Sequence, residues 1–113
     1  MDISEHKVGN ITILKVSGQA TMTSEPGRLS AAVEDRLSEG DRLFIIDLSN
    51  CQRMDSMGLG ELVKTYRLVN DKEGVVKLAS VPLTLRGTIS AVRLSGVLEV
   101  YDSERAAVNS FGS

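Results

Sequence analysis

The hydrophobic residues of this chain follow two kinds of spacing that alternate along it. Short runs of apolar or alternating residues predict strands, and apolar residues three and four positions apart predict helices. The expected strands cover residues 3–8, 11–18, 43–48, 75–79 and 97–101. The expected helices cover residues 24–40, 56–73, 82–96 and 103–111. The predicted order is therefore β-β-α-β-α-β-α-β-α.

This order predicts a single α/β domain over residues 1–113, with a mostly parallel sheet of four to five strands and about four helices. Gly9 and Asn10 form a turn signal, so we expect the first two strands to form a hairpin. Residues 43–48 are almost continuously apolar, which is typical of a parallel strand covered on both faces.

Several residues have the chemistry of helix ends. Ser24 and Ser103 are suited to cap the first and last helices, and Gly40 is suited to end the first. Residues 19–23 are expected to form a polar loop, and residues 110–113 to fray.

Composition narrows the class of function. A net charge of −2, two Phe, two Tyr and no Trp argue against a direct nucleic-acid interface. One cysteine excludes an internal disulfide framework. The acidic start lacks a signal-peptide pattern, and no apolar run has the length of about 20 residues that spans a bilayer. The sequence therefore predicts a cytoplasmic protein without direct membrane contact.

Residues 54–60 carry the most distinctive chemistry, because Ser56 lies between a carboxylate and two close glycines where a helix begins. As a structural residue, Ser56 would cap the helix while Gly58 and Gly60 relieve crowding against the sheet. As a regulatory phosphosite, Ser56 would carry about −1.5 to −2 charges at a helix N-terminus, whose free amides and dipole favour an anion.

Two further interpretations of Ser56 are disfavoured by the residues around it. A nucleophilic serine needs a base, and the one histidine, His6, lies on the first expected strand. Met54 also stands where a nucleophile elbow has glycine. A phosphate-binding loop would need a third glycine, or a lysine directly after a glycine, and Lys64 is a turn too far.

The helix after Ser56 has a second face that could bind a partner. Helical spacing places five residues on the core side: Leu59, Leu62, Val63, Tyr66 and Val69. The same geometry places Met57, Glu61, Lys64 and Leu68 on the opposite side. Exposed Met57 and Leu68 are either scattered surface residues or part of a partner surface, and the sequence leaves both interpretations open.

Residues 55–60, Asp-Ser-Met-Gly-Leu-Gly, follow an apolar strand and precede an amphipathic helix. In this setting the segment resembles the STAS domain of bacterial anti-sigma factor antagonists, and the resemblance covers essentially the whole chain. It implies a phosphorylation-controlled switch without catalytic residue, cofactor or metal. The unphosphorylated protein would bind an anti-sigma factor serine kinase and so release a sigma factor. The kinase would phosphorylate Ser56, and a metal-dependent serine phosphatase would reverse this.

Two positions depart from the family pattern. Met57 replaces the second hydroxyl residue of the motif, and Thr21 stands where an acidic residue is common. The resemblance implies a partner-binding set made of Thr21, Asp55, Ser56, Met57, Gly58, Glu61, Lys64 and Leu68. The alternative function is a STAS subunit of a membrane transport complex, such as a lipid-transport ATPase, and a stressosome-like scaffold is a third possibility.

Overall fold

The computed structural model describes residues 2–20, 27–94 and 98–112 and confirms the predicted α/β class. Five strands form one sheet in the order β1-β2-β3-β4-β5, with β1 antiparallel to β2 and the other neighbours parallel. The strands are β1 (Asp2–Val8), β2 (Ile11–Ala20), β3 (Leu43–Met54), β4 (Val75–Ala79) and β5 (Glu99–Tyr101). Sequential strands are neighbours because the connections between them are short.

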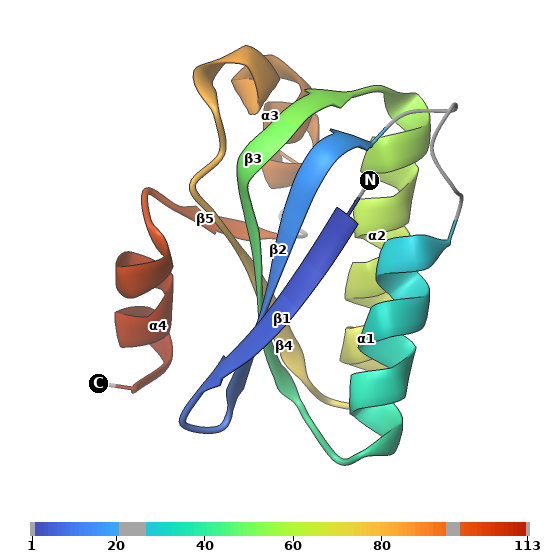
Figure 1. The fold of residues 1–113 in the computed structure, drawn as a ribbon, viewed down its shortest axis with the longest axis vertical. Coiled ribbons are helices and arrows are strands. Elements are labelled where there is room, and N and C mark those ends of the chain that lie inside the picture. The colour runs from blue at the N-terminus through green and yellow to red at the C-terminus, as the bar shows by residue number, and fades with distance from the viewer. Residues whose placement is uncertain (1, 21–26, 95–97, 113) are drawn as a thin grey trace.

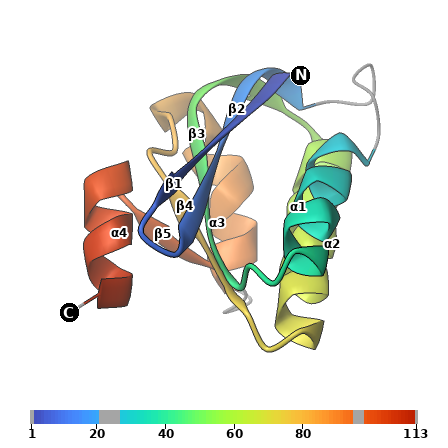
Figure 2. The same ribbon diagram turned by 60° about the horizontal axis from the view of Figure 1, so that its bottom comes forward.

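Helices cover both faces of the sheet (Figure 1). They are α1 (Arg28–Ser38), α2 (Ser56–Asp71), α3 (Arg86–Leu94), preceded by the 3-10 turn η1 (Leu83–Leu85), and α4 (Glu104–Gly112). The first three lie on one face and α4 lies alone on the other, as the turned view in Figure 2 shows.

Each face of the sheet has its own apolar cluster. The larger cluster lies under α1, α2 and α3 and is centred on residues that are fully buried, including Leu14, Val33, Phe44, Ile46 and Leu78. The smaller cluster lies under α4 and contains Ile11, Ile13, Ile45, Ala79 and Ala107. Alternate residues of β2 and β3 point to opposite clusters, which explains why β3 is apolar at nearly every position from 43 to 48.

Several element boundaries differ from the prediction. The expected polar loop at residues 19–23 is wrong for residues 19 and 20, because β2 continues to Ala20. β3 likewise continues six residues past Leu48, to Met54, with Arg53 beside Gln19 and Met54 beside Ala20. Both strands extend here without an apolar pattern, because the backbones of β2 and β3 hydrogen-bond to each other.

The predicted caps had mixed outcomes. The N-cap of α1 is Gly27 with φ 78°, not Ser24, which lies outside the described residues. Gly40 ends the α1 segment as expected, with φ 101°. Ser103 caps α4 through a hydrogen bond from the Ala106 amide to its Oγ.

The expectation that residues 110–113 fray is wrong for residues 110–112, which belong to α4. The Lys77 ammonium donates to Ser110 Oγ at 2.8 Å and lies 4.2 Å from the centre of the Phe111 ring. These contacts tie the end of α4 to β4 beneath it. Residue 113 lies outside the described residues, as do residues 96 and 97 at the predicted end of α3 and start of β5.

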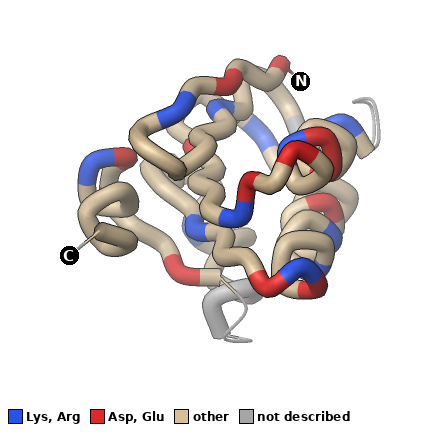
Figure 3. The backbone as a smooth tube through the Cα atoms, turned by 90° about the horizontal axis from the view of Figure 1, so that it is seen from below, with Lys and Arg blue, Asp and Glu red and all other residues tan. Residues whose placement is uncertain are grey.

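Charged residues of both signs are interspersed along the backbone (Figure 3), and some of them join α4 to the sheet. Asp47 on β3 is 2% exposed and faces Glu104, the first residue of α4. Burial favours the neutral form of Asp47, but hydrogen bonds from Glu104 and Ser49 outweigh it and lower the pKa of this carboxyl. The hydrogen bond to Asp47, then burial, raises the pKa of Glu104, against the opposing charges of His6 and Lys15. The shared proton therefore resides on Glu104.

This shared proton predicts a pH-dependent stability. The pKa of Glu104 is raised on folding above its ordinary 4.5, so its contribution is complete below that value and is lost as pH rises through the raised pKa. Above it, two carboxylates face each other, and we expect the free energy of unfolding to fall by about 1 kcal/mol. Glu104→Gln keeps a donor for Asp47 at every pH and should abolish this fall.

Urea denaturation from acid to neutral pH measures the effect. Glu34→Gln, which changes an exposed carboxylate of α1, is the control and should follow the wild type. Parallel pH profiles for Glu104→Gln and the wild type would contradict the shared proton.

Candidate functional site

The distinctive segment lies at the carboxyl end of β3, where the strand passes directly into α2 (Figure 1). Asp55 is the single residue between them, in an extended conformation with φ −111° and ψ −169°. Ser56 is the first residue of the helix and is exposed. In open α/β sheets, ligands bind at this edge, outside the carboxyl ends of the strands.

The helix is capped by Asp55 and not by Ser56. Asp55 Oδ1 accepts hydrogen bonds from the amides of Met57 at 2.9 Å and Gly58 at 3.3 Å. The carbonyl oxygen of Asp55 accepts the first bond of the helical ladder from Leu59 N. The interpretation of Ser56 as the cap is therefore wrong. Aspartate and serine are equally good N-caps, so the sequence alone did not fix which of two adjacent residues holds that position.

This cap changes the electrostatics expected for a modified serine. Two amides of the first turn already bind the Asp55 carboxylate, so they are not free to receive a phosphate on Ser56. The helix dipole still favours negative charge at this end. A phosphate on Ser56 would gain from the dipole, but it would lie beside a carboxylate that is fixed in place.

The buried stripe of α2 differs from the predicted one. It consists of Gly58, Leu62, Thr65 and Val69. Two of these positions are small or polar residues, and hydrophobic spacing therefore passed over them. Thr65 is tolerated there because its hydroxyl donates to the Glu61 carbonyl at 2.8 Å within the helix. Leu59, Val63 and Tyr66, which were assigned to the core face, are partly buried on one flank.

Because the buried stripe differs from the predicted one, two residues predicted to face outward do not do so. Glu61 lies toward α1, where its Oε2 accepts from Ser30 N at 3.1 Å and Ser30 Oγ at 3.2 Å. Leu68 is partly buried and packs against the core cluster, so its predicted outward orientation is wrong. Nothing in the sequence pattern indicated the Ser30–Glu61 link, because it joins two helices across 31 residues.

The residues that do point outward at this end of α2 are Ser56, Met57, Gly60 and Lys64, all exposed. We call this set the Ser56 face. Met57 is 56% exposed, one of the largest exposures of a bulky apolar side chain in the described residues. Its flexible thioether can adapt to a partner surface.

Gly60 has no internal reason to be glycine. A Cβ at this position would meet nothing within 4 Å. The prediction that Gly60 relieves crowding against the sheet is therefore wrong. Gly74 provides the contrast, because a Cβ there would lie 2.5 Å from the carbonyl oxygen of Arg42. An exposed glycine inside a helix costs about 1 kcal/mol relative to alanine. The chain therefore carries a destabilising residue on an exposed helical face.

Other predicted participants lie elsewhere. His6 Nε2 is 3.5 Å from Glu104 Oε1, on the face of the sheet covered by α4 and away from Ser56. Thr21 lies outside the described residues, but Ala20 pairs with Met54, so the chain leaves β2 beside the site. Within the described residues, no cluster of three or more His, Cys, Asp or Glu could hold a metal. No helix there is long and apolar enough to cross a membrane.

The sequence and fold agree with one known family. The model of the STAS domain matches residues 2–107. The chain belongs to the STAS domain family. This confirms the resemblance that the segment at residues 55–60 indicated, and it covers the site and all five strands.

Two proteins with a similar sequence or structure are named as anti-sigma factor antagonists, and a third similar structure is named as a cell fate determinant. An anti-sigma F factor antagonist of Paenibacillus polymyxa is 30% identical over 103 residues, which cover 88% of this chain and 85% of that protein. The structure of an anti-sigma factor antagonist from Mycobacterium paratuberculosis has a TM-score of 0.82 at 21% identity, covering 96% of this chain and 92% of that one. The phosphorylated form of the Bacillus cell fate determinant SpoIIAA has a TM-score of 0.74 at 16% identity, with coverages of 97% and 99%. At these identities the two structures show a shared fold.

The cap geometry makes a prediction about stability. Asp55→Ala removes the acceptor for two helical amides and should lower the free energy of unfolding by about 1 kcal/mol. Ser56→Ala removes an exposed hydroxyl outside the cap and should change it by less than about 0.5 kcal/mol. Chemical denaturation of the two variants and the wild type measures both effects. A larger loss for Ser56→Ala than for Asp55→Ala would show that the serine is the cap.

Proposed function

We propose that this STAS protein is an anti-sigma factor antagonist whose binding to a kinase-type anti-sigma factor is controlled by phosphorylation of Ser56. The supporting observation is that the Ser56 side chain is exposed at the first helical residue, while Asp55 performs the structural work of the cap. A serine that the fold does not need can be modified without unfolding the domain. The name of the Paenibacillus polymyxa relative supports the same function.

The proposed contact is the Ser56 face, with the end of β2 beside it. Met57 offers apolar surface that a partner can bury, and Lys64 adds a positive charge about two turns further along α2. Burial of an exposed large side chain stabilises a complex by roughly 1.5 to 3 kcal/mol. Glu61 and Leu68 are engaged within the domain and take no part in this proposal.

The effect of phosphate would be local. In the free protein, a phosphate on Ser56 remains hydrated and gains from the helix dipole. In a complex it would lose water while the neighbouring amides stay bound to Asp55, and the Asp55 carboxylate would repel it. Phosphorylation therefore leaves the fold intact and weakens binding. A serine phosphatase would restore the binding form.

Incubation with ATP and a kinase-type anti-sigma factor from the same organism, followed by intact mass measurement, tests the proposal. The wild type should gain one phosphate, and Ser56→Ala should gain none while still binding the kinase. Ser4→Ala, at an exposed serine of β1, is the matched control and should be modified like the wild type.

Two results would contradict the proposal. A phosphopeptide that maps to Thr21, Thr23 or Ser24 would place the switch on another segment. An absence of both binding and phosphorylation would remove the antagonist function, and it would favour a STAS subunit of a membrane transport complex.

Gly60 provides an independent prediction about the contact surface. Gly60→Ala should raise the free energy of unfolding by up to about 1 kcal/mol, because the position is helical and open. If a partner packs closely on this glycine, the added methyl should lower the affinity for the anti-sigma factor roughly tenfold. Opposite effects on stability and binding are the expected signature.

Denaturation and titration calorimetry measure the two effects on the same sample. Asn70→Ala is the control, since it improves an exposed helical position about 15 Å further along α2 and should leave binding unchanged. Unchanged affinity for Gly60→Ala would place the interface elsewhere.

A further inference from the structure

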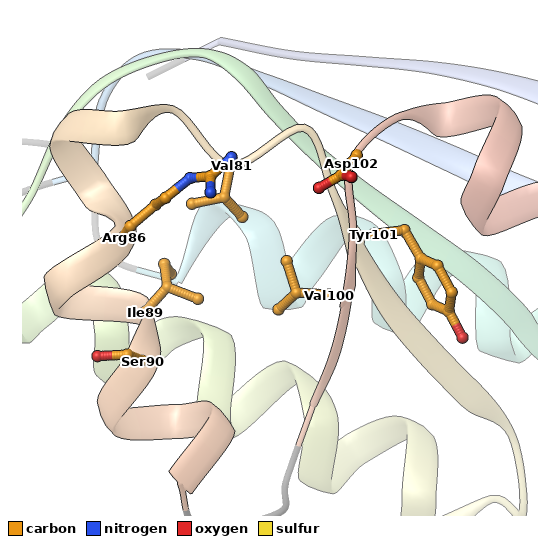
Figure 4. A pocket seen from close by; sticks show the side chains of 7 residues that line it. All are labelled: Val81, Arg86, Ile89, Ser90, Val100, Tyr101 and Asp102. Carbon is orange, nitrogen blue, oxygen red and sulfur yellow. The ribbon is translucent and has the colours of Figure 1, made fainter.

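A pocket lies at the same edge of the sheet as the Ser56 face, beyond the carboxyl ends of β4 and β5. It is a pocket of about 240 Å³ between α3 and β5 (Figure 4). Its lining residues are Val81, Arg86, Ile89, Ser90, Val100, Tyr101 and Asp102. None of them belongs to the Ser56 face. This pocket is also distinct from the position of the phosphate proposed above.

The floor of the pocket is aliphatic. Val81 is 8% exposed and Ile89 is 1% exposed, and Val100 is partly buried. Figure 4 shows Ile89 of α3 and Val100 of β5 facing each other across the gap. Three branched side chains thus form a surface that favours a small apolar group over water.

Two opposite charges stand at the rim of this floor. Arg86 is the first residue of α3, and Asp102 directly follows β5. In Figure 4 the Arg86 guanidinium and the Asp102 carboxylate both extend toward the upper side of the pocket, near Val81. Within the part of the chain that the structure describes, they form no ion pair with each other or with another residue. Both charges therefore remain available to a ligand.

The other polar groups of the pocket are already bonded. Ser90 Oγ donates to the Gly87 carbonyl at 2.9 Å, and the Tyr101 hydroxyl donates to Glu99 Oε2 at 3.3 Å. The start of α3 offers no ordinary anion site, because the Leu85 and Arg86 amides donate to the Pro82 and Leu83 carbonyls. Arg86 and Asp102 are therefore the residues of this pocket that can bind a charged group of a ligand.

We propose that this pocket binds a small zwitterion, specifically an α-amino acid with a branched aliphatic side chain. The ligand carboxylate would pair with Arg86, its ammonium group with Asp102, and its side chain would pack on Ile89 and Val100. A simple anion would be repelled by Asp102, and a simple cation by Arg86. The volume is below the range of about 300 to 1,000 Å³ that suits larger ligands. The proposal does not depend on the function of Ser56.

An NMR titration of the whole protein with L-leucine tests this proposal through the backbone amides of Ile89, Val100 and Asp102. These signals should shift with a dissociation constant of about 1 mM, as expected for a small ligand in an open pocket. Isocaproate lacks the ammonium group and isoamylamine lacks the carboxylate, so each should bind at least about fivefold more weakly. The amides of Met57 and Lys64 serve as an internal reference and should not move.

Matched variants separate specific binding from a general surface effect. Arg86→Gln and Asp102→Asn should each weaken leucine binding at least about fivefold. Arg67→Gln and Asp71→Asn change exposed charges of α2 and should bind leucine like the wild type. Equal binding of leucine and isocaproate would reduce the site to an anion site and overturn the zwitterion proposal. The proposal would also be overturned if the signals did not shift at leucine concentrations far above the expected dissociation constant. Binding of leucine by Arg86→Gln with the affinity of the wild type would overturn it as well.

Discussion

The Asp55 carboxylate at the start of α2 is the interaction on which the site depends. It holds the first turn of the helix directly at the end of β3, without an intervening loop. Two consequences follow from this one contact. The serine that comes next is fixed in position by a helix and a strand, yet its own side chain has no part in fixing them. The anion-binding amides of the helix are also occupied before any modification occurs. A phosphate added to Ser56 would therefore be a charge presented to the surroundings of the protein.

The packing of α2 shows how the domain separates folding from recognition. Gly58 and Thr65 lie in the buried stripe, so part of the packed surface of α2 is formed by residues without large apolar side chains. The flank with Glu61 is joined to α1 through Ser30, which fixes the rotation of the helix about its axis. With the rotation fixed, the same four residues always point outward. Their contribution to the fold is small, and Gly60 even opposes it, so selection for stability does not explain them.

Hydrophobic spacing predicted the class, the order of strands and helices along the chain, and the existence of all five strands and four helices, because burial on a sheet imposes a period that the chain must follow. It failed where hydrogen bonds, and not the burial of apolar side chains, determine the bounds of an element. β3 extends to Met54 through backbone pairing with β2, and Asp55 rather than Ser56 occupies the cap. The predicted rotation of α2 about its axis was also wrong, since Gly58 and Thr65 carry no hydrophobic signal although they are buried. The predicted position of Ser56 at the start of the helix was correct. That prediction depends on where the helix begins along the chain, and not on which side of the helix faces the core.

The two faces of the sheet also divide the protein into regions with different sensitivities. The face under α4 holds the Asp47–Glu104 pair and Lys77, whose partners lie on β5 and α4. Its interactions respond to pH and fix the last helix, but no residue of the Ser56 face takes part in them. The opposite face and the carboxyl edge of the sheet hold the Ser56 face and the pocket between α3 and β5. A change of charge at Ser56 thus acts where partners can approach, at a distance from the charges that hold α4. Under the proposed function, this separation would let a modified serine alter binding while the interactions that hold α4 stay unchanged.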